Sequence, residues 1–156
     1  MLIGVTGDTH NNLKNISKIC DLFNQAKPSL VIHTGDITLP KSQAAFANLK
    51  MPLIGVFGNN DKFEKKGLME EAKKFDCSFF EEPHKIEVDQ KEIIIVHHPE
   101  LINEKMILDA DFILHGHTHR YRSELIQSTL VFNPGECAGI LKGKNNIGLI
   151  LSLIHI

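Results

Sequence analysis

The sequence predicts an α/β fold in which two β-sheets pack on each other and helices cover the outside. Two observations carry this prediction. In the first half of the chain, short apolar runs alternate with stretches in which apolar residues recur at helical spacing, and this alternation favours a parallel sheet with right-handed crossovers. In the second half, apolar runs follow one another with little helix between them, which favours a second sheet packed on the first. At 156 residues, the chain is expected to form one domain spanning residues 1–156.

Strands and helices alternate in the first half. Three apolar runs predict strands, each ending at a polar turn, at residues 2–6, 30–33 and 53–57. Apolar residues between Leu13 and Phe23 recur on one helical face, and Pro28 closes this helix. Residues 41–50 predict a second, shorter helix, and the apolar residues between Leu68 and Phe75 predict a third.

Strands dominate the second half, and we assign them to the second sheet. They are predicted at residues 77–82, 84–88, 92–96, 112–114, 124–126, 130–132 and 147–154. The segment VDQKE at residues 88–92 has the composition of a hairpin turn, and residues 101–108 predict a short helix.

Composition excludes several classes of function. Hydrophobic residues make up 42% of the chain and charged residues 23%, which is typical of a globular protein in water, and no apolar run reaches the length of about 18 residues that a membrane span needs. The net charge of −2 gives no general attraction to nucleic acid or to an acidic membrane. The three cysteines, Cys20, Cys77 and Cys137, are odd in number and widely spaced, so we expect reduced thiols and a cytoplasmic location. The N-terminal segment lacks the basic start and cleavage site of a signal peptide, in agreement with this expectation.

Residues that can bind metals follow five of the apolar runs. Four of the five groups carry a glycine directly before the first polar residue, where it allows a tight turn and a close approach. Side chains beyond the carboxyl ends of parallel strands meet at one edge of a sheet, so we expect them to converge. The candidate ligands are Asp8, His10, Asp36, Asn59, His97, His117 and His119.

The types of these side chains restrict the metal. Carboxylates, a carboxamide and imidazoles without a thiolate suit Mn, Fe, Zn, Co or Ni, and the imidazoles are too many for Ca or Mg alone. Seven ligands are too many for one tetrahedral ion. Two ions about 3.5–4 Å apart, sharing one carboxylate, could hold a hydroxide between them and clamp a phosphate.

The order of these motifs resembles the calcineurin-like metallophosphoesterase superfamily. The motifs are D-x-H, G-D, G-N, a strand-end histidine and G-H-x-H, and the match runs from Gly7 to His119 and continues to NPG at residues 133–135. The small size and the GNND segment are similar to its compact branch of bacterial and archaeal phosphodiesterases, which also resembles the retromer scaffold subunit. The resemblance implies a single metallophosphoesterase domain with a four-layer α/β/β/α sandwich of two mixed β-sheets flanked by helices.

The resemblance also assigns roles by position. It implies a first ion held by Asp8, His10, Asp36 and His119, and a second ion held by Asp36, Asn59, His97 and His117. Mn²⁺ is the favoured ion, with Ni²⁺, Co²⁺, Fe²⁺ and Zn²⁺ as alternatives. We predict a metal-dependent phosphodiesterase in which a bridging hydroxide attacks phosphorus in line, acting on a small phosphodiester or phosphate ester. The residues predicted to be catalytic are His10, Asp36 and Asn59.

The chain departs from the family pattern at three positions. Many relatives have a histidine after the asparagine of the G-N motif, where it can protonate the leaving group, but this chain has Asn60. His10 and His98 are the alternative proton donors. His98 itself replaces a common glycine, and Glu136 stands where a small residue is common, so it could alter the loop or add negative charge near the mouth of the site. Asp61 is a candidate for a supporting role.

The sequence is also compatible with other functions. A non-catalytic protein-binding scaffold like the retromer subunit is the main alternative, but this chain retains every expected ligand. Nuclease relatives carry extra domains or basic surfaces that this sequence lacks, so nucleic acid is not expected as a partner, and neither is a membrane. Small relatives often pair, which leaves a homodimer open. His33 and His115 lie within apolar runs, and we expect structural roles for them.

Overall fold

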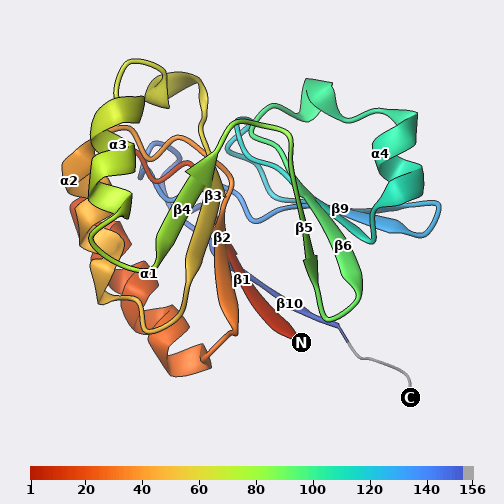
Figure 1. Cartoon of the computed structure of the whole chain (residues 1–156), viewed down its shortest axis with the longest axis horizontal. Helices are drawn as coiled ribbons and strands as arrows, with labels where there is room; N and C mark the ends of the chain where they lie inside the picture. Colours follow the sequence, from red (N-terminus) through yellow and green to blue (C-terminus); the bar gives the residue numbers. More distant parts are fainter. Residues whose placement is uncertain (153–156) are drawn as a thin grey trace.

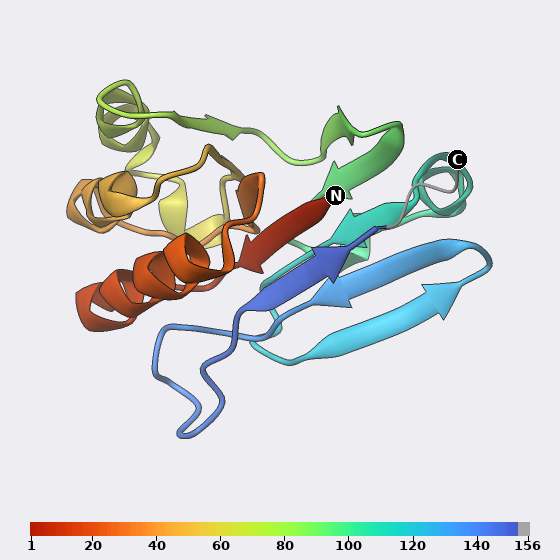
Figure 2. The same cartoon turned by 90° about the horizontal axis from the view of Figure 1, so that it is seen from below.

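The computed structural model describes residues 1–152, which form two five-stranded sheets that face each other. Helices lie on the two outer sides, three against the first sheet and α4 (Glu104–Asp109) against the second (Figures 1 and 2). Each sheet contains both parallel and antiparallel pairs. These layers confirm the predicted α/β sandwich of two mixed sheets flanked by helices.

The first sheet has the strand order β10-β1-β2-β3-β4. Its strands are β1 (Leu2–Thr6), β2 (Leu30–His33), β3 (Leu53–Val56), β4 (Cys77–Phe80) and β10 (Gly148–Leu151). Strands β1 to β4 are parallel, and β10 is antiparallel to β1. The connecting helices are α1 (Leu13–Ala26), α2 (Pro40–Ala45) with the 3₁₀ turn η1 (Phe46–Asn48), and η2 (Asn59–Asp61) with α3 (Lys65–Ala72). The right-handed crossovers of a parallel sheet place these helices on one face.

Helix α1 packs closely on strand β1. Its N-terminus is capped by Asn12, whose side chain accepts a hydrogen bond from the Asn15 N–H, and it ends at Lys27 in the left-handed conformation. The buried face of α1 includes Phe23, which leaves no room for a side chain on the strand beneath it. A Cβ atom at Gly4 would lie 2.6 Å from the Phe23 ring, so glycine permits this close approach.

The second sheet has the strand order β5-β6-β7-β9-β8. Its strands are β5 (His84–Val88), β6 (Lys91–Ile95), β7 (Phe112–Leu114), β8 (Arg122–Ile126) and β9 (Thr129–Asn133), with η3 (Pro99–Leu101) and α4 between β6 and β7. Val88 pairs with Lys91, and the two residues between them, Asp89 and Gln90, have φ of 48° and 64°. This is the two-residue hairpin turn that the segment at 88–92 predicts.

Two strands lie in a different sheet from the one expected. The runs at 77–82 and 147–154 were assigned to the second sheet, whereas β4 pairs parallel with β3 and β10 pairs antiparallel with β1 in the first sheet. Phe79 of β4 packs in the layer between the first sheet and its helices, which fixes β4 at that edge. Closely spaced apolar runs predict strands, but they do not determine which sheet each strand joins or at which edge. Residues 153–154 of the predicted last strand lie outside the described residues.

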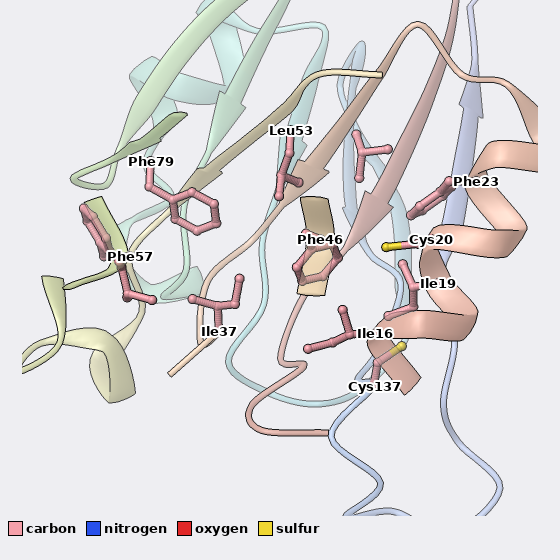
Figure 3. Packing of buried hydrophobic residues seen from close by; sticks show 12 residues of the cluster. Ile16, Ile19, Cys20, Phe23, Ile37, Phe46, Leu53, Phe57, Phe79 and Cys137 are labelled. Carbon is pink, nitrogen blue, oxygen red and sulfur yellow. The ribbon is translucent and has the colours of Figure 1, made fainter. Parts of the chain in front are cut away.

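The buried side chains of residues 1–152 form three clusters, one at each boundary between layers. The first lies between the helices and the first sheet and includes Phe23, Phe46 and Phe79 (Figure 3). The second joins the two sheets through residues such as Ile3 and Ile95, and a third lies under α4. These clusters hold both sheets so that the loops following β1, β2, β3, β6 and β7 share one edge of the molecule (Figure 1).

None of the helices within residues 1–152 is long and apolar enough to cross a lipid bilayer.

Candidate metal centre

The predicted ligands sit in loops with an unusual backbone conformation. Positive φ values between 46° and 70° occur at Asp8, His10, Asp36, His117 and His119. Non-glycine residues adopt this left-handed region rarely, and such conformations concentrate at functional sites because the surrounding structure must hold them. Five of the seven candidate ligands share this conformation. Their loops therefore adopt irregular backbone conformations that are typical of functional sites.

The first cluster contains two carboxylates and two imidazoles. One ligand atom each from Asp8, His10, Asp36 and His119 lies within 4.8 Å of the others. The separation is 3.6 Å from His10 Nε2 to Asp36 Oδ2 and 3.6 Å from His119 Nε2 to Asp8 Oδ1. These pairs are too long for hydrogen bonds and are close to the separation of two atoms that each lie about 2.0–2.2 Å from one metal ion.

His10 provides a direct test of whether these residues suit a metal. Its Nε2 atom is buried and has no hydrogen-bond partner among residues 1–152, which is costly for a polar atom. Burial also lowers the pKa of His10, which favours the neutral ring, and a neutral imidazole has one nitrogen with a free lone pair. An unpaired neutral nitrogen that faces a buried carboxylate fits a divalent cation.

The second cluster adjoins the first through Asp36. Asn59 Oδ1 lies 3.0 Å from His97 Nε2 and 3.2 Å from His117 Nδ1. The same oxygen of Asp36 that faces His10, Oδ2, lies 3.5 Å from His97 Nε2. Asp36 therefore stands between the two clusters, and all seven predicted ligands come together at one edge of the two sheets.

Burial and neighbouring charges shift the pKa values of the carboxylates and of His97 at the centre. Burial raises the pKa of Asp8 to about 6, although His97 and His119 oppose this change. Burial acts against the charge of Asp36 as well, but the neighbouring His97 and the hydrogen bonds from Asn60 hold its pKa well below the usual range. Burial would lower the pKa of His97, but the neighbouring Asp36 and Asp8 raise it to about 9. Buried carboxylates need compensating positive charge, which a proton on His97 or a bound cation can supply.

A backbone carbonyl and a carboxylate orient two of the candidate ligands. The Nδ1–H of His97 donates to the carbonyl of Thr34 at 2.9 Å, and the Nδ1–H of His119 donates to Glu136 Oε2 at 3.0 Å. In both rings Nε2 is left to face the cluster, the tautomer that a metal-ligating histidine needs.

Glu136 is fully buried and also accepts hydrogen bonds from the backbone N–H groups of Ile140 and Leu141. Of the two roles expected for Glu136, altering its loop or adding charge at the mouth of the site, full burial excludes the second. Its contact with His119 was missed, because only the position directly after NPG marked Glu136 and no local pattern pointed to a histidine 17 residues away.

Asp61 and Asn60 support the centre in different ways. The buried carboxylate of Asp61 accepts hydrogen bonds from the backbone N–H groups of Asp36 at 2.9 Å, Thr38 at 2.7 Å and Gly58 at 2.7 Å. Asp61 therefore ties the loop after β2 to the loop after β3, and its carboxylate makes no hydrogen bond to a histidine within residues 1–152. Asn60 donates to Asp36 through its backbone N–H and its side-chain amide.

The glycine before Asn59 is explained by its distance from Asp36. A Cβ atom at Gly58 would lie 2.2 Å from Asp36 Oδ1, so a side chain at this position would clash with the carboxylate.

Two other histidines lie outside the two clusters. His33 is fully buried, accepts from the Gly35 N–H and donates through Nε2 to Thr9, so it links the loops after β1 and β2. Burial lowers its pKa to about 3. His115 is buried and donates through Nδ1 to the carbonyl of Gly116.

Comparison with known families identifies this arrangement. The family model of the calcineurin-like phosphoesterase superfamily domain matches residues 1–154. The chain belongs to the calcineurin-like phosphoesterase superfamily. Phosphodiesterase MJ0936 of Methanocaldococcus jannaschii, a relative of this chain, is 35% identical over 154 residues, which cover 96% of this chain and 92% of that protein. Calcineurin-like phosphoesterases of this metallophosphoesterase type act with divalent metals, and the two clusters here offer sites of that kind.

Solved structures of other proteins agree with the fold. An archaeal phosphodiesterase superimposes with a TM-score of 0.83 and 33% identity, covering 97% of this chain and 94% of that one. The phosphoesterase YfcE from E. coli has a TM-score of 0.73 at 20% identity, over 96% and 87% of the two chains. Vps29 of Chaetomium thermophilum has a TM-score of 0.70 at 19% identity, over 97% and 82%. The last two likenesses show the fold alone.

Proposed function

We propose that this calcineurin-like phosphoesterase is a metal-dependent phosphodiesterase with a dinuclear centre, folded as a single domain of residues 1–156. One observation carries the proposal: Asp36 Oδ2 lies 3.6 Å from an imidazole of the first cluster and 3.5 Å from an imidazole of the second. A carboxylate at this position could bridge two adjacent ions of the kind that clamp a phosphate group. The identity of 35% with a phosphodiesterase over nearly the whole chain supports the same class of reaction.

The two clusters define which residues would hold each ion. Asp8, His10, Asp36 and His119 would hold the first, and Asp36, Asn59, His97 and His117 the second. When bound, two divalent ions would polarise the phosphoryl oxygens and lower the pKa of a coordinated water toward about 7, so that hydroxide is available for in-line attack on phosphorus. Mn²⁺ is the ion we favour; the mixture of carboxylate and imidazole ligands without thiolate suits it, as it also suits Ni²⁺, Co²⁺, Fe²⁺ and Zn²⁺.

The residues around the centre restrict the substrate. Asn60 occupies the position at which many relatives carry a proton-donating histidine, and its amide is committed to Asp36 at 2.7 Å. An amide cannot protonate a leaving group, so small diesters with good leaving groups should react fastest. His10 and Asp36 of the first cluster and Asn59 of the second are the residues that would contact the reacting phosphate group.

The three thiols fit a reducing compartment. Cys20, Cys77 and Cys137 are free in the structure, and burial raises the pKa of Cys20 and Cys137 to about 11 and that of Cys77 to about 12. Such thiols are protected from oxidation, and we propose a cytoplasmic location on this basis.

Hydrolysis of bis-p-nitrophenyl phosphate tests the proposed function. The metal-free protein should be inactive, turnover should appear on adding Mn²⁺ or Ni²⁺, and a chelator should abolish it reversibly. Asp36→Asn should remove this activity because it removes the charge shared by both clusters, whereas Asp21→Asn, on the exposed side of α1, should leave it unchanged.

A protein that binds two ions per chain but hydrolyses none of a panel of diesters and monoesters would contradict the proposal. That result would favour a non-catalytic protein-binding scaffold on the same fold.

A further inference from the structure

A third imidazole lies beside the second cluster. One ring nitrogen of His98 lies within 4.8 Å of a nitrogen of His97 and of a nitrogen of His117. The ring centroid of His98 is 4.8 Å from that of His97 and 4.6 Å from that of His117. The side chain of His98 is 31% exposed, so burial in an apolar core does not explain its position. Three imidazoles from two separate loops therefore converge on one region.

Glu82 holds His98 in this position. Glu82 lies in the connection from β4 to β5, where the chain passes from the first sheet to the second. Its Oε1 lies 2.5 Å from Nδ1 of His98, and its Oε2 accepts from the backbone N–H groups of His97 at 2.5 Å and His98 at 2.9 Å. The carboxylate is 15% exposed. Within the described part of the chain, the hydrogen bonds of this carboxylate thus go to the two adjacent histidines.

This contact determines which nitrogen of His98 is free. A carboxylate at Nδ1 favours the tautomer that carries its proton there, which leaves a lone pair on Nε2. Metal-ligating histidines usually show this arrangement, because the carboxylate fixes the ring and makes the other nitrogen a stronger ligand. Glu136 and His119 form the same kind of pair in the first cluster.

We propose that His98 is a further ligand of the second ion, beside Asn59, His97 and His117, and that Glu82 is the residue that positions it. This inference rests on the proposed dinuclear centre and adds a residue to it. The second ion would then have three imidazole ligands, whereas the first has two. Because imidazole suits Co²⁺, Ni²⁺ and Zn²⁺ better than Mg²⁺, the second position should discriminate more strongly against Mg²⁺.

Titration of the metal-free protein with Co²⁺, followed by calorimetry and by visible absorption, tests the role of His98. The unaltered chain should bind two ions. In His98→Gln, the dissociation constant of one ion should rise about tenfold or more and its visible spectrum should change, while the other ion binds as before. Glu82→Gln should weaken the same ion by about tenfold, because the ring keeps its nitrogen but loses its orientation.

Two control variants match these changes. His84→Gln removes an imidazole that stacks on Phe80 at 3.8 Å, outside both clusters. Glu81→Gln removes the neighbouring carboxylate, which is paired with Lys65. Both should bind two ions as the unaltered chain does. Thermal unfolding of the metal-free variants checks that each one folds. If Glu82→Gln is unstable, His98→Gln alone decides the test, because the His98 substitution leaves both backbone hydrogen bonds to Glu82 in place.

The possible outcomes separate this inference from the proposed function. Two-ion binding by His98→Gln with both dissociation constants within twofold of the unaltered chain would overturn the role of His98, even if turnover fell, because His98 would then act on the substrate. Binding of only one ion by the unaltered chain would overturn the dinuclear centre itself and the role of His98 with it.

Discussion

At the scale of single residues, Glu136 offers a test of how outer contacts support a metal ligand. It is fully buried and hydrogen-bonded to His119 Nδ1. Glu136→Gln should weaken Mn²⁺ binding at the first cluster by about 10–100-fold, because the amide no longer enforces the tautomer of His119. Isothermal titration measures this directly.

The matched control for Glu136 is Glu124→Gln, which alters an exposed carboxylate paired with Arg122. This variant should bind Mn²⁺ as the unaltered chain does. Equal Mn²⁺ affinities for Glu136→Gln and Glu124→Gln would show that the contact with His119 is merely structural.

His33 predicts a pH dependence of stability. Burial lowers the pKa of His33 to about 3 in the folded state, whereas an unfolded histidine has a pKa of about 6.5. Between these values the unfolded chain binds a proton that the folded chain does not, so the free energy of unfolding falls as the pH falls. The contribution is fully present above pH about 6.5 and is lost toward pH 3, with a slope of about 1.4 kcal/mol per pH unit.

Urea unfolding at several pH values, with chelator present, checks this prediction. His33→Gln should be less stable at neutral pH, since it disturbs the bonds to Thr9 and Gly35, but its stability should fall less steeply between pH 6 and 4. A slope unchanged by the substitution would mean that His33 does not titrate as the structure implies.

At the scale of elements, helix α1 stabilises the first sheet without contributing a ligand. Phe23 is fully buried in the layer between this helix and the sheet (Figure 3). Phe23→Ala should reduce the free energy of unfolding by about 3–5 kcal/mol. Leu22→Ala, on the same helix but 41% exposed, should cost about 1 kcal/mol or less. Chemical denaturation compares the two, and a similar loss in both would contradict the packing described here.

The elements also show where sequence reasoning succeeds and where it stops. The existence of the strands and the hairpin turn after Val88 could be predicted, because apolar runs and turn residues are local patterns. The sheet to which β4 and β10 belong could not, since pairing depends on packing partners such as Phe79 that are distant in sequence.

The same limit applies to the site. Convergence of the seven candidate ligands follows from the geometry of parallel strands, but the contacts of Glu82 and Glu136 with histidines 16 and 17 residues away leave no local trace.

At the scale of the whole molecule, the metal centre joins the two sheets. Asp8, Asp36 and Asn59 follow strands of the first sheet, and His97 and His117 follow strands of the second. Ions bound between them should therefore stabilise the complete fold. Mn²⁺ at a hundredfold excess over its dissociation constant should add about 2.7 kcal/mol to the free energy of unfolding for each ion that binds only the folded chain.

Thermal unfolding with and without Mn²⁺ measures this effect. The unaltered chain should show a large rise in its unfolding midpoint, and Asp36→Asn should show little. The same rise in both proteins would place the binding of Mn²⁺ elsewhere on the molecule.

The most direct test of the central claim is anomalous diffraction from crystals grown with Mn²⁺. We predict two adjacent peaks on either side of Asp36, one bounded by Asp8, His10 and His119 and the other by Asn59, His97 and His117. A single peak, or none within these clusters, would contradict the dinuclear centre on which the proposed phosphodiesterase function depends.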